Sequence, residues 1–135
     1  MKIIKTQIKD LILIKTELFR DKRGYFKEVE KFKVLKKKFI FDCFSYSKKN
    51  TLRGLHLQTN KSQAKIITVV HGKILDVAVD LRKGSCTFGQ FASVVLSAEN
   101  NLQFWVPPGF AHGFVVLSDI ADFEYKCTDY YDPSD

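Results

Sequence analysis

Cysteine and histidine are scarce in this sequence, which has three of each in 135 residues. Cys43, Cys86 and Cys127 stand far apart and form no CxxC pair. No stretch of about eighteen apolar residues is present that could cross a membrane, and no apolar N-terminal run leads to a cleavage site. These absences predict a cytoplasmic protein with reduced thiols and no membrane partner.

Aromatic side chains and positive charge are abundant. The 12 phenylalanines and five tyrosines suit β-sheets packed face to face, in a single domain covering residues 1–135. The net charge of +7 favours an anionic partner, although the lysine-rich stretch 31–39 also fits a solvated surface. Because no nucleic-acid-binding module accompanies this charge, we expect a small phosphorylated ligand rather than nucleic acid.

Short β-strands dominate the secondary structure that the sequence predicts. Extended segments recur every eight to twelve residues or so between Gly, Asn and Pro signals, which is typical of an antiparallel sandwich or barrel. A hairpin is expected within 64–82, with His71-Gly72 as its turn. Only 29–38 has helical spacing. The predicted class is all-β, with the other extended segments at 11–19, 39–47, 91–97, 102–106, 112–118 and 121–131.

The segment "RGLHLQ" (53–58) combines a histidine, an arginine and a glycine in one predicted strand. Simple alternation puts His56 and Gln58 on one face and Arg53 on the other. Gly54 permits a β-bulge between them. Such a bulge would turn Arg53 and His56 toward the same cavity.

Alternation also groups polar residues in two other predicted strands. Asp76, Ala78 and Asp80 share a face, and so do Phe123, Tyr125 and Cys127.

An interior lined by His56, Lys65 and Tyr125 would form an acid–base site. A histidine can act as general base, a buried lysine can stabilise an oxyanion, and a tyrosine can return a proton. Each residue also has a purely structural interpretation: His56 as a histidine whose hydrogen bonds are satisfied within the strand, Lys65 as a lysine at the rim of the barrel, and Tyr125 as a tyrosine of the core. Spacing alone leaves these alternatives open.

The segment "WVPPGFAHGF" (105–114) contains the pattern P-x-G-x-x-H, ending at His112. This pattern resembles the second motif of cupin barrels. Many cupins bind a metal through H-x-H in their first motif, but the corresponding residues are His56-Leu57-Gln58. We therefore predict no metal.

Four segments together resemble the dTDP-4-dehydrorhamnose 3,5-epimerases. They are "FRDKRGYFKE" (19–28), "LRGLHLQ" (52–58) with 63–89, "LSAENNLQFWVPPGFAHGFVVLS" (96–118) and "ADFEYKCTDYYDP" (121–133). The resemblance implies a cupin-type jelly-roll barrel that forms a homodimer, binds a nucleotide-linked 4-keto sugar and uses no cofactor. A diphosphate would also suit the net positive charge.

The resemblance also implies roles for individual residues. His56 resembles the base that removes the proton beside the keto group, Tyr125 the acid on the opposite face, and Lys65 the cation that steadies the enolate. The residues that match pocket-lining positions are Arg53, Asp76, His112 and Tyr131. The residues that match a segment reaching the nucleotide, often from the neighbouring subunit, are Phe19, Arg23 and Glu28.

Two departures from the family pattern affect these expectations. The family usually continues beyond Asp135 with a tail whose aspartate pairs with the catalytic histidine. The resemblance therefore leaves two alternatives: Asp76, Asp80 or another carboxylate substitutes for that aspartate, or catalysis is impaired. The family pattern Q-x-N-x-S-x-S corresponds to "FDCFSYS" (41–47), in which Phe41 and Cys43 replace polar residues that face the ligand in the family.

Two other functions are compatible with the sequence. Nucleotide-sugar 3,4-ketoisomerases are also small cupins, but they usually show R-G-x-H-x-H, and Gln58 replaces the second histidine. A non-catalytic cupin that binds nucleotide-sugars would have no need of His56, Lys65 and Tyr125 together. Epimerisation is the predicted function, at C-3 alone or at both C-3 and C-5.

Overall fold

The computed structural model describes residues 1–29 and 31–135. In this part of the chain, β-strands alternate with short connections, and one short helix, α1 (Phe32–Leu35), precedes the fifth strand. The strands are β1 (Lys2–Lys5), β2 (Ile12–Lys15), β3 (Leu18–Asp21), β4 (Gly24–Lys27), β5 (Phe41–Lys48), β6 (Leu52–His56), β7 (Lys65–His71), β8 (Lys73–Asp80), β9 (Phe91–Ser97), β10 (Leu102–Val106), β11 (Phe110–Val116) and β12 (Ile120–Cys127).

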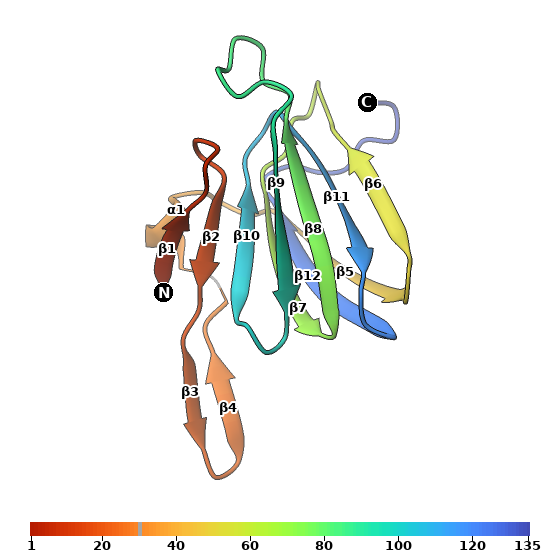
Figure 1. The fold of residues 1–135 in the computed structure, drawn as a ribbon. Helices are drawn as coiled ribbons and strands as arrows, with labels where there is room; N and C mark the ends of the chain where they lie inside the picture. The colour runs from red at the N-terminus through yellow and green to blue at the C-terminus, as the bar shows by residue number, and fades with distance from the viewer. Residues whose placement is uncertain (30) are drawn as a thin grey trace.

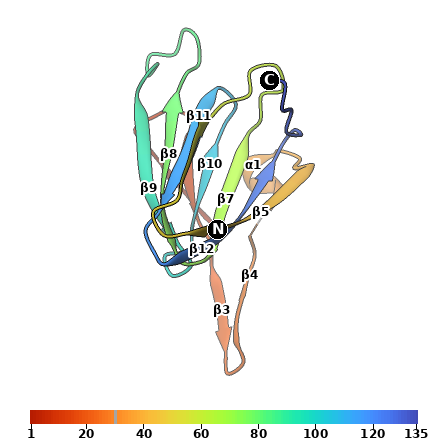
Figure 2. The same ribbon diagram turned by 90° about the vertical axis from the view of Figure 1, so that its right-hand side faces the viewer.

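Two antiparallel sheets form the body of the protein (Figure 1). One has six strands in the order β1-β2-β10-β7-β12-β5, and the other has four in the order β6-β11-β8-β9. Figure 2 shows the two layers, with β8, β9 and β11 on one side and β7 and β5 on the other. Apart from the pairs β1–β2 and β8–β9, the neighbouring strands are not consecutive in sequence, as in a jelly roll. The predicted all-β jelly-roll class is confirmed.

Alternation along the strands directs one face of each sheet into the shared core. On β8 the side chains at 74, 76, 78 and 80 are buried, while those between them are less so. Phe114 of one sheet meets Phe123 of the other edge to face, with ring centroids 4.6 Å apart. Truncating either ring to alanine would cost about 3–5 kcal/mol of stability.

The expected hairpin within 64–82 is wrong. β7 and β8 are consecutive in sequence but belong to different sheets, where their partners are distant strands. Gly72 (φ +77°) therefore forms a corner between the sheets, and a Cβ there would lie 2.2 Å from the carbonyl oxygen of Ile120. The turn signal was present, but a local signal does not specify which strands pair.

Two other expected elements differ in extent. The helix expected at 29–38 is the single turn Phe32–Leu35, and Glu30 lies outside the described residues. The extended segment 11–19 divides into β2, which joins the six-stranded sheet, and β3, which pairs only with β4.

The β3–β4 hairpin projects away from both sheets (Figures 1 and 2). Phe19 on β3 is 51% exposed, and Arg23 lies in the turn. No helix within the described residues is long and apolar enough to span a membrane.

Candidate active site

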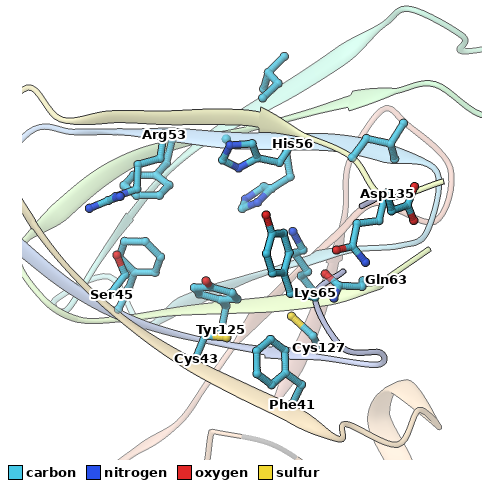
Figure 3. A pocket seen from close by; sticks show the side chains of 18 residues that line it. Phe41, Cys43, Ser45, Arg53, His56, Gln63, Lys65, Tyr125, Cys127 and Asp135 are labelled. Atoms are coloured by element: carbon cyan, nitrogen blue, oxygen red, sulfur yellow. The ribbon is translucent and has the colours of Figure 1, made fainter. Parts of the chain in front are cut away.

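A cavity of about 590 Å³ opens between the two sheets (Figure 3). One wall comes from β6 and β11 of the four-stranded sheet, and the opposite wall comes from β5, β7 and β12 of the six-stranded sheet. Loop residues around 57–63 and the C-terminal segment complete it. The predicted residues on its surface are Arg53, His56, Lys65, His112, Tyr125 and Tyr131.

A β-bulge in β6 turns both Arg53 and His56 into this cavity. His56 pairs with His112 and Arg53 pairs with Phe114, so Gly54 and Leu55 together oppose Gly113. The strands approach closely here, because a Cβ on Gly54 (φ +111°) would lie 2.7 Å from the Cα of Gly113. The predicted bulge is confirmed, and it explains the glycine in "RGLH".

Arg53 extends along the cavity toward β5. Its Nε donates a hydrogen bond to Ser47 Oγ at 3.3 Å. The Arg53 side chain is exposed. A guanidinium in this position can donate two parallel hydrogen bonds to the oxygens of a phosphate group.

His112 forms a hydrogen-bonded pair with Asp76, with Nε2 and Oδ1 2.7 Å apart. Asp76 is fully buried behind the histidine and reaches the cavity only through it. The second oxygen, Oδ2, has no hydrogen-bond partner among the described residues. A buried carboxylate in this position fixes the orientation of the imidazole.

Neither aspartate suggested as a substitute partner for His56 serves as one. Asp76 is engaged by His112, because β11 lies between β8 and β6 in the sheet. Asp80 lies at the end of β8, where it accepts hydrogen bonds from Arg82, Ser85 and Thr87. The Arg82 guanidinium, as the main cause, holds the pKa of the Asp80 carboxyl well below its usual range.

Tyr125 faces His56 from the other sheet (Figure 3). On β12 it stands directly opposite Cys43 of β5, and Phe123 and Cys127 lie on the same face, as alternation predicted. Burial, followed by the adjacent Cys43 thiol, raises the pKa of Tyr125 to about 12, and the positive charge of Arg53 opposes the rise. The phenol is therefore protonated at neutral pH.

Lys65 begins β7 and is half-buried on the same wall as Tyr125. Its neighbours across the sheet are Val106 and Cys127. Burial raises the pKa of the Cys127 thiol to about 11, with the Lys65 charge opposing the rise, so this thiol is neutral. Lys65 thus supplies a positive charge in a wall that is otherwise largely uncharged.

The three residues of the expected nucleotide-reaching segment lie away from this chain's own cavity. Phe19 packs against Phe26 within the hairpin, Arg23 forms an ion pair with Asp21, and Glu28 forms an ion pair with Lys31.

Several cavity residues were not predicted as site residues from the sequence. Ser45 lines the wall from β5 beside Phe41 and Cys43, which the resemblance had placed at ligand-facing positions, and alternation along "FDCFSYS" was a usable signal for Ser45. Gln58, Gln63 and Asp135 lie at one end of the cavity, where loops meet. Alternation had placed Gln58 on the face of His56, whereas Gln63 and Asp135 lie in loops that carry no periodic signal.

Metal-binding residues do not gather in the described parts of the chain, since no group of three or more His, Cys, Asp or Glu side chains comes together there. That the protein uses no metal and no other cofactor stays a prediction.

Comparison with known proteins identifies the family. Residues 5–135 match the family model for dTDP-4-dehydrorhamnose 3,5-epimerase. The enzyme of that name from Salmonella typhimurium is 50% identical over 99% of this chain and 77% of its own length. The one from Neisseria gonorrhoeae is 49% identical over 98% of this chain, which spans only 42% of that protein.

A solved structure agrees with these sequence matches. The crystal structure of dTDP-6-deoxy-D-glucose-3,5-epimerase from Legionella pneumophila, in complex with dTDP-4-keto-L-rhamnose, superimposes with a TM-score of 0.95 at 50% identity. The match covers 98% of this chain and 74% of that structure. The chain belongs to the dTDP-4-dehydrorhamnose 3,5-epimerase family, whose cupin-type jelly roll its motifs predicted.

Proposed function

We propose that this protein is an epimerase of the isomerase class that inverts C-3, or both C-3 and C-5, of a dTDP-linked 4-keto-6-deoxy sugar without a cofactor. The observation that carries the proposal is the placement of two proton-transfer groups on opposite walls of one cavity. His56 comes from the four-stranded sheet and Tyr125 from the six-stranded sheet. Inversion of a carbon needs a base on one face and a proton donor on the other.

The reaction begins when the unprotonated imidazole of His56 removes a proton from the carbon beside the ketone. The electron pair of the broken C–H bond moves into the carbonyl, which becomes an enolate. The ammonium of Lys65 stabilises the charge on the enolate oxygen. Tyr125 then donates its hydroxyl proton to the opposite face of the same carbon, and the ketone re-forms with the configuration inverted. Exchange with solvent returns a proton to Tyr125 and removes one from His56.

Arg53 and the His112–Asp76 pair orient the substrate. The guanidinium of Arg53 binds the diphosphate, for which its fork of N–H donors is suited. Because Asp76 holds His112 Nε2 at 2.7 Å, the imidazole keeps one orientation on the cavity wall. It can then contact a substrate oxygen without reorganisation when charge develops.

Hydrogen–deuterium exchange tests the proposal. The purified protein is incubated in deuterium oxide with a dTDP-linked 4-keto-6-deoxy sugar, while NMR follows the C-3 and C-5 protons. We expect exchange and inversion at one or both carbons, and loss of both in His56→Asn. His71→Asn is the matched control, because His71 lies on an exposed corner outside the cavity. Binding without exchange would contradict catalysis, and migration of the keto group would indicate a ketoisomerase.

The protein functions as a homodimer in this proposal. The β3–β4 hairpin projects away from its own cavity, which leaves Phe19, Arg23 and Glu28 available to a second copy. One apolar row also crosses the outward face of the four-stranded sheet: Leu52, Val115, Leu75 and Val95 are successive register partners. Leu52 is 70% exposed, and such a face is suited to packing against another copy.

Subunit mixing tests whether the hairpin acts on the partner's site. His56→Asn and Arg23→Ala proteins are each expected to be nearly inactive. If Arg23 acts on the partner, each mixed dimer contains one intact site, so equimolar mixing with subunit exchange restores about a quarter of the wild-type rate. No recovery, despite mixed dimers detected by mass spectrometry, would show that Arg23 acts on its own subunit, and an active Arg23→Ala protein would show that Arg23 has no role.

A cytoplasmic location fits the same proposal. Cys43, Cys86 and Cys127 are free thiols, and two of them line the cavity. A reducing compartment would keep them in this state.

A further inference from the structure

Two chain segments lie side by side at one end of the cavity. The first is the loop 57–64 after β6, and the second is the segment 128–135 after β12, called the strap below. In Figure 3, Asp135 and Gln63 lie at this end, and Arg53 lies at the opposite end. A backbone hydrogen bond joins the inner ends of the two segments, since Thr128 N–H donates to Ala64 O at 3.1 Å.

The side chain of Gln58 connects the loop to the strap. Its amide nitrogen donates to the carbonyl oxygens of Lys61 (2.9 Å) and Tyr130 (3.2 Å). Its amide oxygen accepts a hydrogen bond from Asp132 N–H at 2.8 Å. The contacts to the strap therefore fall on the residues immediately before and after Tyr131.

The carboxylate of Asp135 makes a second connection, further along the strap. It accepts hydrogen bonds from the backbone N–H groups of Thr59 (2.9 Å), Asn60 (2.8 Å) and Lys61 (2.8 Å), and from the hydroxyl of Thr59 (2.9 Å). These donors, Lys61 N–H first, hold the pKa of the Asp135 carboxyl below its usual range, so the connection is complete at neutral pH. Three successive backbone donors form a nest that is suited to an anion.

The two connections lie close to two residues that line the cavity, His56 and Tyr131. Gln58 lies in the loop two residues after His56, the last residue of β6, so the strap is tied to the chain next to the proposed base. Tyr131 is 67% exposed, yet it lines the cavity. Its position is set by the hydrogen bonds of Gln58 with the backbone of Tyr130 and Asp132, the residues on either side of it.

We infer that Gln58 and Asp135 are positioning residues, which hold the strap across the end of the cavity away from Arg53 and so keep Tyr131 in contact with the substrate. The inference rests on the proposed function, because it assigns these residues to substrate binding by that site. Neither side chain takes part in proton transfer. Their loss should therefore weaken binding more than it slows the chemical step.

The test combines kinetics with a double-mutant cycle. We expect Asp135→Ala to raise KM about tenfold and to change kcat by about twofold or less. Tyr131→Ala should raise KM similarly. Because Asp135 acts through Tyr131, the double variant should resemble the single variants rather than show the product of their effects. Gln58→Met, which retains the length of the side chain without its polar atoms, should couple to Tyr131→Ala in the same way.

Amide hydrogen exchange provides a readout that needs no substrate. In Asp135→Ala, exchange at residues 59–61 should accelerate about tenfold or more, while exchange within β7 stays unchanged. Asp129→Asn is the matched control, because among the described residues the Asp129 carboxylate accepts a hydrogen bond only from the backbone N–H of the next strap residue, Tyr130 (2.8 Å).

The outcomes separate this inference from the proposed function. Multiplicative KM effects of Asp135→Ala and Tyr131→Ala, or unchanged exchange at 59–61, would overturn the inference in an active enzyme. If the wild-type protein has no epimerase activity, the proposed function fails. The role of Gln58 and Asp135 in substrate binding then fails as well, even if amide hydrogen exchange shows that Asp135 holds residues 59–61.

Discussion

Replacing His56 with asparagine is expected to lower kcat/KM for epimerisation by about a thousandfold, the usual contribution of a general base. Asparagine has a similar shape to the imidazole but cannot accept the substrate proton. The fold should be unaffected, because His56 is exposed at the end of β6 and its backbone pairing with His112 does not depend on the side chain. The rate is measured by NMR with a dTDP-linked 4-keto-6-deoxy sugar, and folding by circular dichroism.

His112 is the alternative base that this experiment must exclude. It pairs with His56 in the sheet and lines the same cavity, and its bond to Asp76 is of the kind that often supports a catalytic histidine. Its Nε2, however, is already engaged by the carboxylate. We expect His112→Asn to reduce turnover while deuterium still enters the substrate. If deuterium incorporation persists in His56→Asn and disappears in His112→Asn, the base is His112.

Residue alternation and glycine position predicted part of the walls of the cavity. The period of two correctly grouped Phe123, Tyr125 and Cys127, and Gly54 correctly indicated the bulge. Both are local properties of an extended chain, so a single sequence contains them.

Strand partnership could not be predicted in the same way. The turn signal at Gly72 predicts a hairpin, because local turn chemistry is the same whether the chain returns to its own sheet or crosses to another. The partner of Asp76 depended on which strand lies between β8 and β6, and this is a property of the topology. Contacts between loops, such as Asp135 with residues 59–61, have no periodic pattern to indicate them.

Tyr125→Phe is expected to separate the two halves of the reaction. Phenylalanine preserves the packing against Phe123, whose ring centroid lies 6.1 Å away, but it removes the proton donor. His56 can still take the proton and return a deuteron to the same face. Deuterium incorporation should therefore persist, while inversion falls by about a hundredfold or more. Tyr46→Phe is the matched control, because Tyr46 is exposed on β5 and lies outside the cavity.

The pH dependence of the wild-type enzyme provides a second check on Tyr125. Burial and the Cys43 thiol raise its pKa to about 12, so the phenol retains its proton through the neutral and mildly alkaline range. A donor with a raised pKa loses activity only as the pH rises through that value. The rate of inversion should therefore not decline through ionisation of Tyr125 below strongly alkaline pH. The pH–rate profile of Cys43→Ala should keep the same shape in that range. If Tyr125→Phe inverts the substrate at the wild-type rate, the donor is another group, and the assignment of the two walls to base and acid is wrong.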